Sequence, residues 1–424
     1  MTLSPLDNAV DLQLSEAVLG SGLAVRVDHR PERRGGYIAL GVDFGSIDRG
    51  AAGRSVPAGT AHFLEHELFE DDAGDVSDRF AALGASANAF TGFSGTTFIA
   101  STTRDMHAAI ELLLKFVQSP SFDNERIARE RSVIVQEIRM YDDDPDWRVF
   151  EGLMGCLFEH HPVREQIAGS EQSIADIDAA LLESVHGQHY HPQALCLAVS
   201  GPIDPDDVHA LAEADQLARP ARDADRCVRA AVSEPRGRVH ERYVVELPIA
   251  RPRLLLGIKE TVLGGDQEQL ARRQLVTRMG LDLVLGRSSS AFETLYEAGL
   301  IDESFGVSHS AESDFGFTTM GGETDQPEEL AARLKDLLGK ALKQGLDRRA
   351  HERVHHKVYG SLMRALESPE AVAHGLISSR FRGVEPFRVA AMVADVSLDE
   401  VHARLVEHVC DEAFAHAVAR PSSS

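Results

Sequence analysis

Two histidines and a glutamate near the start of the chain have the spacing of metal-binding residues on a helix. His62 and His66 lie four residues apart in the segment AHFLEHELFE, and Glu65 directly precedes the second histidine. Residues i and i+4 of a helix share one face, so both imidazoles can reach one ion while Glu65 projects beside them. One common form of catalytic zinc site has two neutral histidines, one further protein ligand and an open position for water. The segment therefore predicts two zinc ligands and an acid that could hold the water.

The same three residues could instead form a chance pattern on a solvated helix surface. The residues around them argue for a partly buried helix, because four of them are apolar. They are Phe63, Leu64, Leu68 and Phe69. Burying two imidazoles and a carboxylate without partners is costly, which favours a bound metal. The inverted order H-x-x-E-H also occurs among the motifs of zinc peptidases.

A later helical segment, residues 125–141, offers the carboxylate that would complete such a site. Glu130 and Glu137 are seven residues apart, which is two helical turns, so both face the same side. Either could be the third ligand, and the other could hydrogen-bond a ligating imidazole and fix its tautomer. The alternative is that both belong to a surface face that pairs with three neighbouring arginines.

The chain reads as two similar halves with a period of roughly 200 residues, which indicates domain duplication. In each half, strand-like segments precede a helix, a strand pair and two long helices. We predict an α+β fold of two homologous domains, each a mixed or mostly antiparallel sheet with helices on one face. A polar, charged stretch between the halves is the candidate linker. The predicted boundaries are residues 1–218 for the N-terminal domain, 219–238 for the linker and 239–424 for the C-terminal domain.

Composition restricts the partners and the location. The chain has 43 Lys and Arg residues and 67 Asp and Glu residues, which give a net charge of −24. Nucleic acid and anionic membranes are therefore poor partners, whereas a cationic peptide is an acceptable one. No segment has the ~18–20 continuous apolar residues of a membrane span. The N-terminal segment lacks the pattern of a secretory signal, and four scattered cysteines indicate a reducing compartment. We therefore expect a cytoplasmic protein.

Four ordered motifs together resemble the pitrilysin/insulysin family of zinc peptidases, in particular its half-length branch of mitochondrial processing peptidase and bacterial homologues. The motifs are AHFLEHELFE, ASANAFT, ERSVIVQEIRMYDDDP and YHPQALCLAVSGPID. The resemblance implies that His62 and His66 bind one zinc ion and that Glu137 completes the set. It also implies that Glu65 is the general base, and that Glu130 supports the site without binding the ion.

The family has an edge strand beside its zinc, and the resemblance places Asn88, Ala89 and Phe90 on that strand. An exposed edge offers unpaired N–H and C=O groups, to which an extended peptide can add as a further strand. The side chain of Asn88 could also hydrogen-bond the substrate backbone. The alternative is that Asn88 only caps a strand or turn.

The second half of the chain departs from the family's catalytic pattern. It has no HxxEH motif, and the histidines within residues 351–356 have no second cluster to face, so we expect one metal site per chain. Active chains of the family, or their partners, carry an Arg and a Tyr that grip the peptide in a segment like LFxxLREKxGLAY. Here the segment reads AFETLYEAGLIDESFG, with Tyr296 in place of the Arg and Asp302 or Glu303 near the position of the Tyr.

These features predict a zinc-dependent endopeptidase that cleaves peptides held extended in an enclosed chamber. Because the Arg and Tyr are missing, we expect a heterodimer with a related family subunit that supplies them, and a homodimer is the other arrangement. Two further classes compete with this reading. One is a non-catalytic scaffold of the same family, which would have no need of four metal-site residues. The other is a zinc hydrolase of small molecules, which would have little use for a duplicated, chamber-forming architecture.

Overall fold

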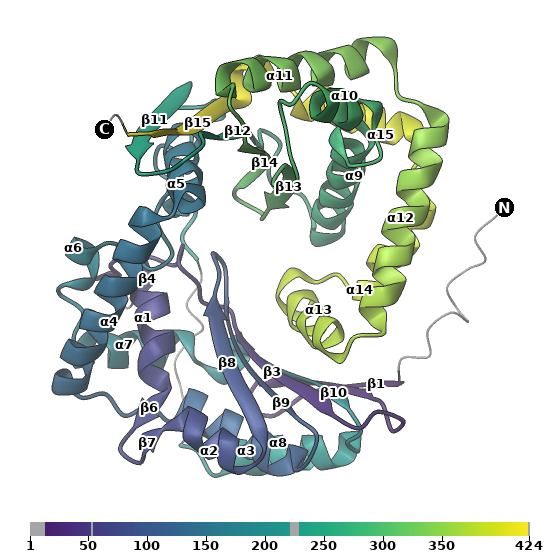
Figure 1. Cartoon of the computed structure of the whole chain (residues 1–424). Coiled ribbons are helices and arrows are strands. Elements are labelled where there is room, and N and C mark those ends of the chain that lie inside the picture. The colour runs from purple at the N-terminus through teal and green to yellow at the C-terminus, as the bar shows by residue number, and fades with distance from the viewer. Residues whose placement is uncertain (1–12, 52–53, 221–228, 423–424) are drawn as a thin grey trace.

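The computed structural model describes residues 13–51, 54–220 and 229–422. Its two large sheets, one of six strands and one of five, each carry their own helices and face each other across the molecule (Figure 1). We call the part built on the six-stranded sheet the N-terminal lobe and the part built on the five-stranded sheet the C-terminal lobe. The predicted α+β fold with two similar sheet-and-helix units is confirmed.

The N-terminal sheet has a mixed topology that places a late strand in its middle. Strand β10 lies between β2 and β3, parallel to the former and antiparallel to the latter, and β8 is an edge strand. The strand pair predicted in the first half is the hairpin of β8 and β9. In sheet order, the strands are β1 (Gln13–Val18), β2 (Ala24–His29), β10 (Leu195–Gly201), β3 (Gly36–Val42), β9 (Thr96–Thr102) and β8 (Ala85–Thr91).

The C-terminal sheet repeats this arrangement without a counterpart of β1. Strand β15 is inserted between β11 and β12, parallel to the former and antiparallel to the latter, and β13 is an edge strand like β8. In sheet order, the strands are β11 (Arg242–Leu247), β15 (Phe414–Pro421), β12 (Arg253–Lys259), β14 (Gly316–Glu323) and β13 (Gly306–Ala311).

The helices also follow one order in both halves, with two before the edge hairpin and several after it. In the first half they are α1 (Thr60–Leu68), α2 (Val76–Ala82), α3 (Met106–Gln118), α4 (Asn124–Asp143), α5 (Pro145–Leu157), α6 (Glu171–Ile174), α7 (Ala179–His189) and α8 (Pro205–Leu217). In the second half they are α9 (Gln267–Leu285), α10 (Ser290–Glu297), α11 (Pro327–Gln344), α12 (Arg348–Leu366), α13 (Pro369–Arg382), α14 (Pro386–Ala394) and α15 (Leu398–His408). Two short hairpins, β4 (Gly50–Ala51) with β5 (Arg54–Ser55) and β6 (Glu70–Asp71) with β7 (Gly74–Asp75), flank α1. None of the helices in the described part of the chain combines the length and apolar character needed to cross a membrane.

The two faces of the N-terminal sheet pack against helices from different halves of the chain. Large aliphatic residues of β2, β3 and β10 join the main core, which includes α3 and α8. On the other face the strands present small residues such as Ala39 and Ala198, and α13 of the second half packs there (Figure 1). A Cβ on Gly41 would lie 2.4 Å from Cγ2 of Ile377, so only glycine admits the helix at this distance. The expectation that helices cover one face only is therefore wrong.

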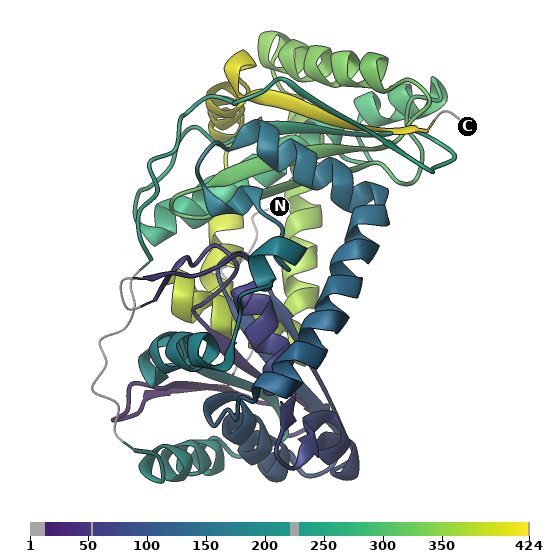
Figure 2. The same cartoon turned by 90° about the vertical axis from the view of Figure 1, so that its left-hand side faces the viewer.

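The reciprocal contact is made by α5, which comes from the first half and packs against β11, β12 and β15 (Figure 2). Here too the sheet presents small residues, among them Ala415, Ala417 and Ala419. A Cβ on Gly257 would lie 2.8 Å from both Cδ atoms of Leu153, so this helix also needs a glycine beneath it. Each sheet is thus covered on one face by a helix from the other half of the chain.

The described part of the predicted linker makes specific contacts with both lobes. Of the predicted range 219–238, residues 221–228 lie outside the described residues. Glu234 accepts hydrogen bonds from the backbone N–H groups of residues 159–161 and from Nζ of Lys259, the latter at 2.7 Å. Burial opposes its ionisation, but these donors outweigh burial and lower the pKa of Glu234 to about 2. The carboxylate therefore fixes the loop after α5 to β12. The domain boundaries themselves remain a prediction.

Candidate metal centre

Helix α1, which carries the HxxEH segment, begins at a position that requires glycine. Gly59 precedes the helix with a φ of +86°, and a Cβ there would lie 2.4 Å from the carbonyl oxygen of Ala168. The hydroxyl of Thr60 donates to the carbonyl oxygen of Pro57 at 2.8 Å. The start of the helix is therefore fixed against the rest of the lobe.

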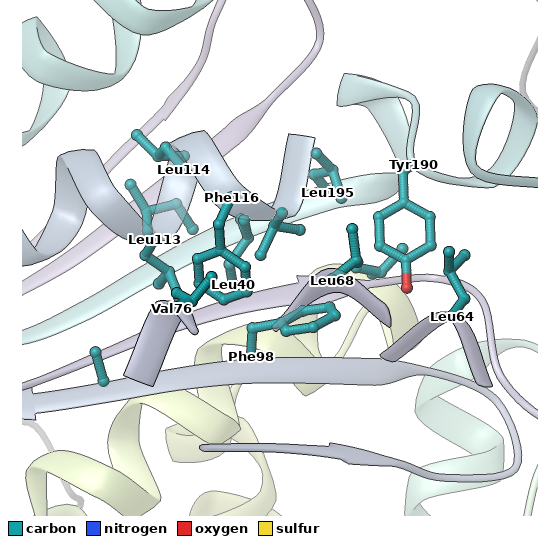
Figure 3. Close-up of a cluster of buried hydrophobic side chains, with 14 of the residues drawn as sticks. Leu40, Leu64, Leu68, Val76, Phe98, Leu113, Leu114, Phe116, Tyr190 and Leu195 are labelled. Atoms are coloured by element: carbon teal, nitrogen blue, oxygen red, sulfur yellow. The ribbon is translucent and has the colours of Figure 1, made fainter. Parts of the chain in front are cut away.

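Apolar residues orient α1 and leave its histidines on the side of α4. Leu64 and Leu68 are buried in the main core of the N-terminal lobe, near Phe98 and Tyr190 (Figure 3). Phe63 belongs to the same core. Because these residues occupy the core side of a nine-residue helix, the other side is left to the polar residues.

Helix α4 is oriented in the same way and presents its two glutamates to α1. Ile127, Ile134 and Ile138 are buried in the core, and Glu130 and Glu137 occupy an adjoining side of the helix, half-buried. Asp123 caps the helix by accepting the N–H of Arg126. Helix α4 thus places both carboxylates next to the HxxEH segment, although they are distant from it in sequence.

The two histidines and Glu137 converge on one point. Nε2 of His62 lies 3.6 Å from Oε1 of Glu137, and Nε2 of His66 lies 3.5 Å from Oε2 of the same carboxylate. These separations are long for hydrogen bonds. Two ligands held ~2.0–2.1 Å from one tetrahedral zinc ion are about 3.4 Å apart, which matches what is observed. The residues therefore fit a zinc ion in ligand type and in spacing, and they are the one such cluster within the described ranges.

The protonation of His62 suits a metal ligand. Burial and the neighbouring charge of His66 lower the pKa of His62 to about 4, so the imidazole is neutral at pH 7. Its Nδ1 atom is buried and has no hydrogen-bond partner. Neutral imidazole is the form that binds zinc.

Glu130 contacts the outer side of His66, which favours Glu137 over Glu130 as the third ligand. Nδ1 of His66 donates to Oε1 of Glu130 at 2.7 Å, and this leaves the Nε2 lone pair directed away from Glu130. Burial lowers the pKa of His66, but the hydrogen bond and charge of Glu130 outweigh burial and raise it on balance. The histidine thus attracts a cation, whether a proton or a metal. Glu137, by contrast, faces Nε2 of both histidines.

Glu65 is buried beside the cluster and is held by a residue that the sequence did not reveal. The hydroxyl of Thr91, the last residue of β8, donates to Oε2 of Glu65. Burial raises the pKa of Glu65, and the Thr91 hydrogen bond opposes this only in part. Thr91 belongs to a strand distant in sequence, so no spacing rule could have pointed to it.

Tyr141 is a second residue that sequence reasoning missed. Its hydroxyl donates to Oε1 of Glu137 at 2.6 Å, and its ring packs against Trp147. Burial and the neighbouring Glu137 raise the pKa of Tyr141, so the phenol stays protonated and remains a donor. The i,i+4 spacing of the two residues on one helix was the signal that could have identified it.

The residues predicted to bind substrate lie on the exposed edge of the N-terminal sheet. Asn88, Ala89 and Phe90 are in the middle and second half of β8, which has β9 on one side and, among the described residues, no strand on the other. Oδ1 of Asn88 accepts the N–H of Ala89 at 2.9 Å, and Phe90 is 46% exposed. Asn88 therefore lies within a strand rather than at a turn. Its role toward a peptide stays a prediction.

The C-terminal residues that the sequence compared with the family's clamp make other contacts in this structure. Tyr296, on α10, is 51% exposed and stacks on Phe292. Asp302 pairs with Arg251 at 2.8 Å.

Comparison with known proteins agrees with this architecture. The model of the family described as insulinase (peptidase family M16) matches residues 25–171, and the model described as the peptidase M16 inactive domain matches residues 176–358. A Bacillus subtilis (strain 168) protein named uncharacterized zinc protease YmfH is 33% identical over 397 residues, which cover 92% of each chain.

Solved structures show the same fold. The crystal structure of an M16-like peptidase from Alicyclobacillus acidocaldarius superposes with a TM-score of 0.94 and 30% identity, covering 100% of both chains. A protease from Helicobacter pylori gives a TM-score of 0.84 at 18% identity, covering 97% of this chain and 100% of that one, which shows a shared fold.

The fold and the cluster of two histidines and a glutamate define a two-lobed protein of the zinc-peptidase type. The chain belongs to peptidase family M16, the insulinase or pitrilysin family, and the resemblance seen in the sequence is confirmed. Its relatives are named zinc proteases, which supports a peptidase that uses zinc.

Proposed function

We propose that the protein is a zinc-dependent endopeptidase and the zinc-bearing subunit of a heterodimer. The observation that carries the proposal is the convergence of both Nε2 atoms on the two oxygens of Glu137, with Glu65 buried alongside. In this proposal His62, His66 and Glu137 hold one zinc ion. When bound, the zinc would supply a Lewis acid and lower the pKa of a water molecule.

The chain's own residues then perform the proton transfers and the positioning. Glu65 takes a proton from the attacking water and later delivers it to the leaving amine of the peptide. Glu130 keeps the imidazole of His66 in the tautomer that binds a metal through Nε2. Tyr141 fixes the carboxylate of Glu137, and Thr91 fixes that of Glu65.

The peptide would lie extended along β8, because this edge strand ends at Thr91, which contacts Glu65. The free N–H and C=O groups of an edge strand can pair with any peptide backbone, which suits an enzyme that binds extended chains. Asn88, Ala89 and Phe90 are the residues proposed to contact it.

A related subunit is proposed because the family's Arg and Tyr have no equivalent here. Tyr296 replaces the Arg, and Asp302 is already paired with Arg251. Losing an electrophilic contact of this kind typically costs ~10²–10³ in rate, which a partner chain with the intact segment would restore. A homodimer is the alternative assembly. The acidic surface and the scattered cysteines support a cytoplasmic location.

Metal analysis and a peptide assay on the purified full chain test the peptidase. We expect about one zinc per chain and cleavage of a quenched-fluorescent peptide that a chelator abolishes and added zinc restores. Absence of bound zinc would favour a non-catalytic scaffold of the family. Zinc binding with hydrolysis of small esters or amides, but of no peptide, would favour a small-molecule hydrolase.

Co-purification tests the subunit proposal. We expect a related chain with an intact Arg/Tyr segment to purify with this one and to raise its rate of peptide cleavage. If the chain alone cleaves peptides as fast as with any such partner, the heterodimer proposal fails while the peptidase proposal stands.

A further inference from the structure

The C-terminal lobe contains a cavity of about 250 Å³ between α9, α12, β13 and the segment around α10. Its charged lining residues are Arg278, Asp282, Arg287 and Lys357. Three of the four are cationic, although the whole chain has a net charge of −24. Such a concentration of positive charge on an acidic protein needs an explanation, because like charges in one cavity repel each other unless an anion joins them.

The cavity occupies the place in the C-terminal lobe that the metal centre occupies in the N-terminal lobe. Each lies between the first of the two helices before the edge hairpin (α1 or α9), the second long helix after it (α4 or α12) and the edge strand itself. Where α1 and α4 bring histidines to a glutamate, α9 and α12 bring Asp282 to Lys357, whose Nζ lies 2.7 and 2.9 Å from the two carboxylate oxygens. This ion pair neutralises the one carboxylate in the cavity lining, so the lining offers no free carboxylate to a cation.

Two arginines of the cavity keep their charge unpaired. Nε of Arg278 donates to the carbonyl oxygen of His309 at 3.0 Å, and Nη2 of Arg287 donates to that of Glu303 at 3.1 Å. Both partners are neutral carbonyl groups, and neither guanidinium forms an ion pair with a described residue. Both side chains are exposed, so an incoming ligand can reach them. Guanidinium groups bind carboxylates through paired hydrogen bonds.

Apart from Ser308 and His309, the rest of the cavity wall consists of glycines and apolar residues, among them Phe292 and Phe305. A carboxylate that is attached to an apolar group therefore fits the lining better than a free inorganic anion.

The neighbouring larger cavity of about 870 Å³ is lined both by Phe90 of β8 and by Ser310 of β13. A chain that extends along the interior can thus reach β13, which also lines the cationic cavity, from the edge strand near the metal centre.

We propose that this cationic cavity binds the C-terminal carboxylate of a peptide, with Arg278 and Arg287 as its ligands and the aromatic wall against the last side chain. The proposal deepens the proposed function and rests on it for the choice of a peptide as ligand. The cavity would anchor the end of a peptide whose preceding residues lie toward β8. The protein would then recognise the C-terminus of the peptide as well as its backbone.

The test measures binding to the full-length Glu65→Gln variant, so that no hydrolysis interferes. The probe is a short, alanine-rich, fluorescein-labelled peptide that ends in leucine, made once as the free acid and once as the terminal amide. Fluorescence anisotropy should show the acid binding about tenfold more tightly than the amide. Adding Arg278→Gln should remove this difference, whereas adding Arg333→Gln, a change of an exposed arginine on α11, should preserve it.

A third peptide distinguishes a carboxylate at the C-terminus of the peptide from a carboxylate on an acidic side chain. It is the terminal amide with glutamate in place of the alanine before the leucine, and it should bind like the plain amide. Equal binding of acid and amide would overturn the proposal, as would a preference that persists in both Arg278→Gln and Arg287→Gln. Tight binding of the glutamate-containing amide would overturn the assignment to the terminus. The binding test is independent of hydrolysis. If the variant prefers the free-acid peptide but the wild-type protein cleaves no peptide, the proposed function fails and the proposed carboxylate site stands.

Discussion

Each lobe buries a glutamate among polar residues, and the two glutamates have opposite properties. Glu65 in the N-terminal lobe accepts a hydrogen bond from a neutral hydroxyl, and burial raises its pKa. Glu260 in the C-terminal lobe contacts Arg404 and His408. Burial opposes its ionisation, but the hydrogen bond and charge of His408 and the charge of Arg404 lower its pKa to about 2.

The difference lies in how each polar cluster balances its charge. Around Glu260 the guanidinium of Arg404 also donates to Thr277, and His408 hydrogen-bonds Thr318, so the C-terminal cluster is satisfied by its own members. The N-terminal cluster has three glutamates and two histidines, of which His62 is neutral. Because the N-terminal cluster has surplus negative charge and converging ligand atoms, a cation from outside is needed to balance it. This need distinguishes a binding site from a structural network whose charges balance one another.

The sharpest test of this contrast is Glu65→Gln. We expect peptide hydrolysis to fall by about 10²–10⁴-fold, because general-base catalysis contributes this much, while the zinc content stays the same. Rates with a quenched-fluorescent peptide and metal analysis measure the two quantities. Glu111→Gln, a change of an exposed residue on α3, is the matched control. A native rate in Glu65→Gln would remove this residue from the mechanism.

The converse test is Glu260→Gln, which should affect stability and not hydrolysis. Breaking a buried ion pair leaves Arg404 uncompensated, so the free energy of unfolding at pH 7 should fall by about 3 kcal/mol. Because the folded pKa lies below the usual 4.5, the native carboxylate stabilises the protein above pH 4.5, and this contribution is lost as the pH falls toward 2. Urea unfolding at several pH values should show less acid dependence in the variant. Unchanged stability would mean that the cluster is not the structural network described above.

A smaller effect is expected from Glu130→Gln, which tests whether the N-terminal cluster extends beyond its three proposed ligands. Residues that orient a metal-bound histidine typically contribute 10–100-fold to metal affinity, so zinc should bind weaker by about that factor. Competition with a chromophoric chelator measures it. The control is Glu125→Gln, in the exposed first turn of the same helix. Equal affinities for both variants would reduce Glu130 to a surface residue.

The smallest effect concerns the edge strand. In Asn88→Ala we expect KM for a peptide to rise about threefold with kcat unchanged, since one hydrogen bond to the substrate backbone is lost. Ser86→Ala changes another exposed residue of β8 and should leave KM as it was. If both variants behave like the wild type, the peptide does not use the Asn88 side chain.

Local patterns predicted much of the molecule. The i,i+4 histidines, the paired strands and the duplicated order of elements follow from periodicity within short windows, and the structure contains them all. The contact of Thr91 with Glu65 and the packing of α13 on the N-terminal sheet could not be predicted in this way. Both depend on which surfaces meet in three dimensions, and no spacing within a segment encodes that. Gly41 and Ala39 read as ordinary strand residues until the helix above them is known.

Each lobe depends on a helix from the other half of the chain, because α13 packs on the N-terminal sheet and α5 packs on the C-terminal sheet. A cut between the lobes would leave each piece with a helix that has no sheet beneath it and a sheet with an uncovered alanine-lined face. Each piece would keep its own main core but lose the packing on the other face of its sheet, and both would expose apolar surface that favours aggregation. The halves descend from a duplicated unit, yet each sheet now needs a helix of the other half to cover one of its two faces.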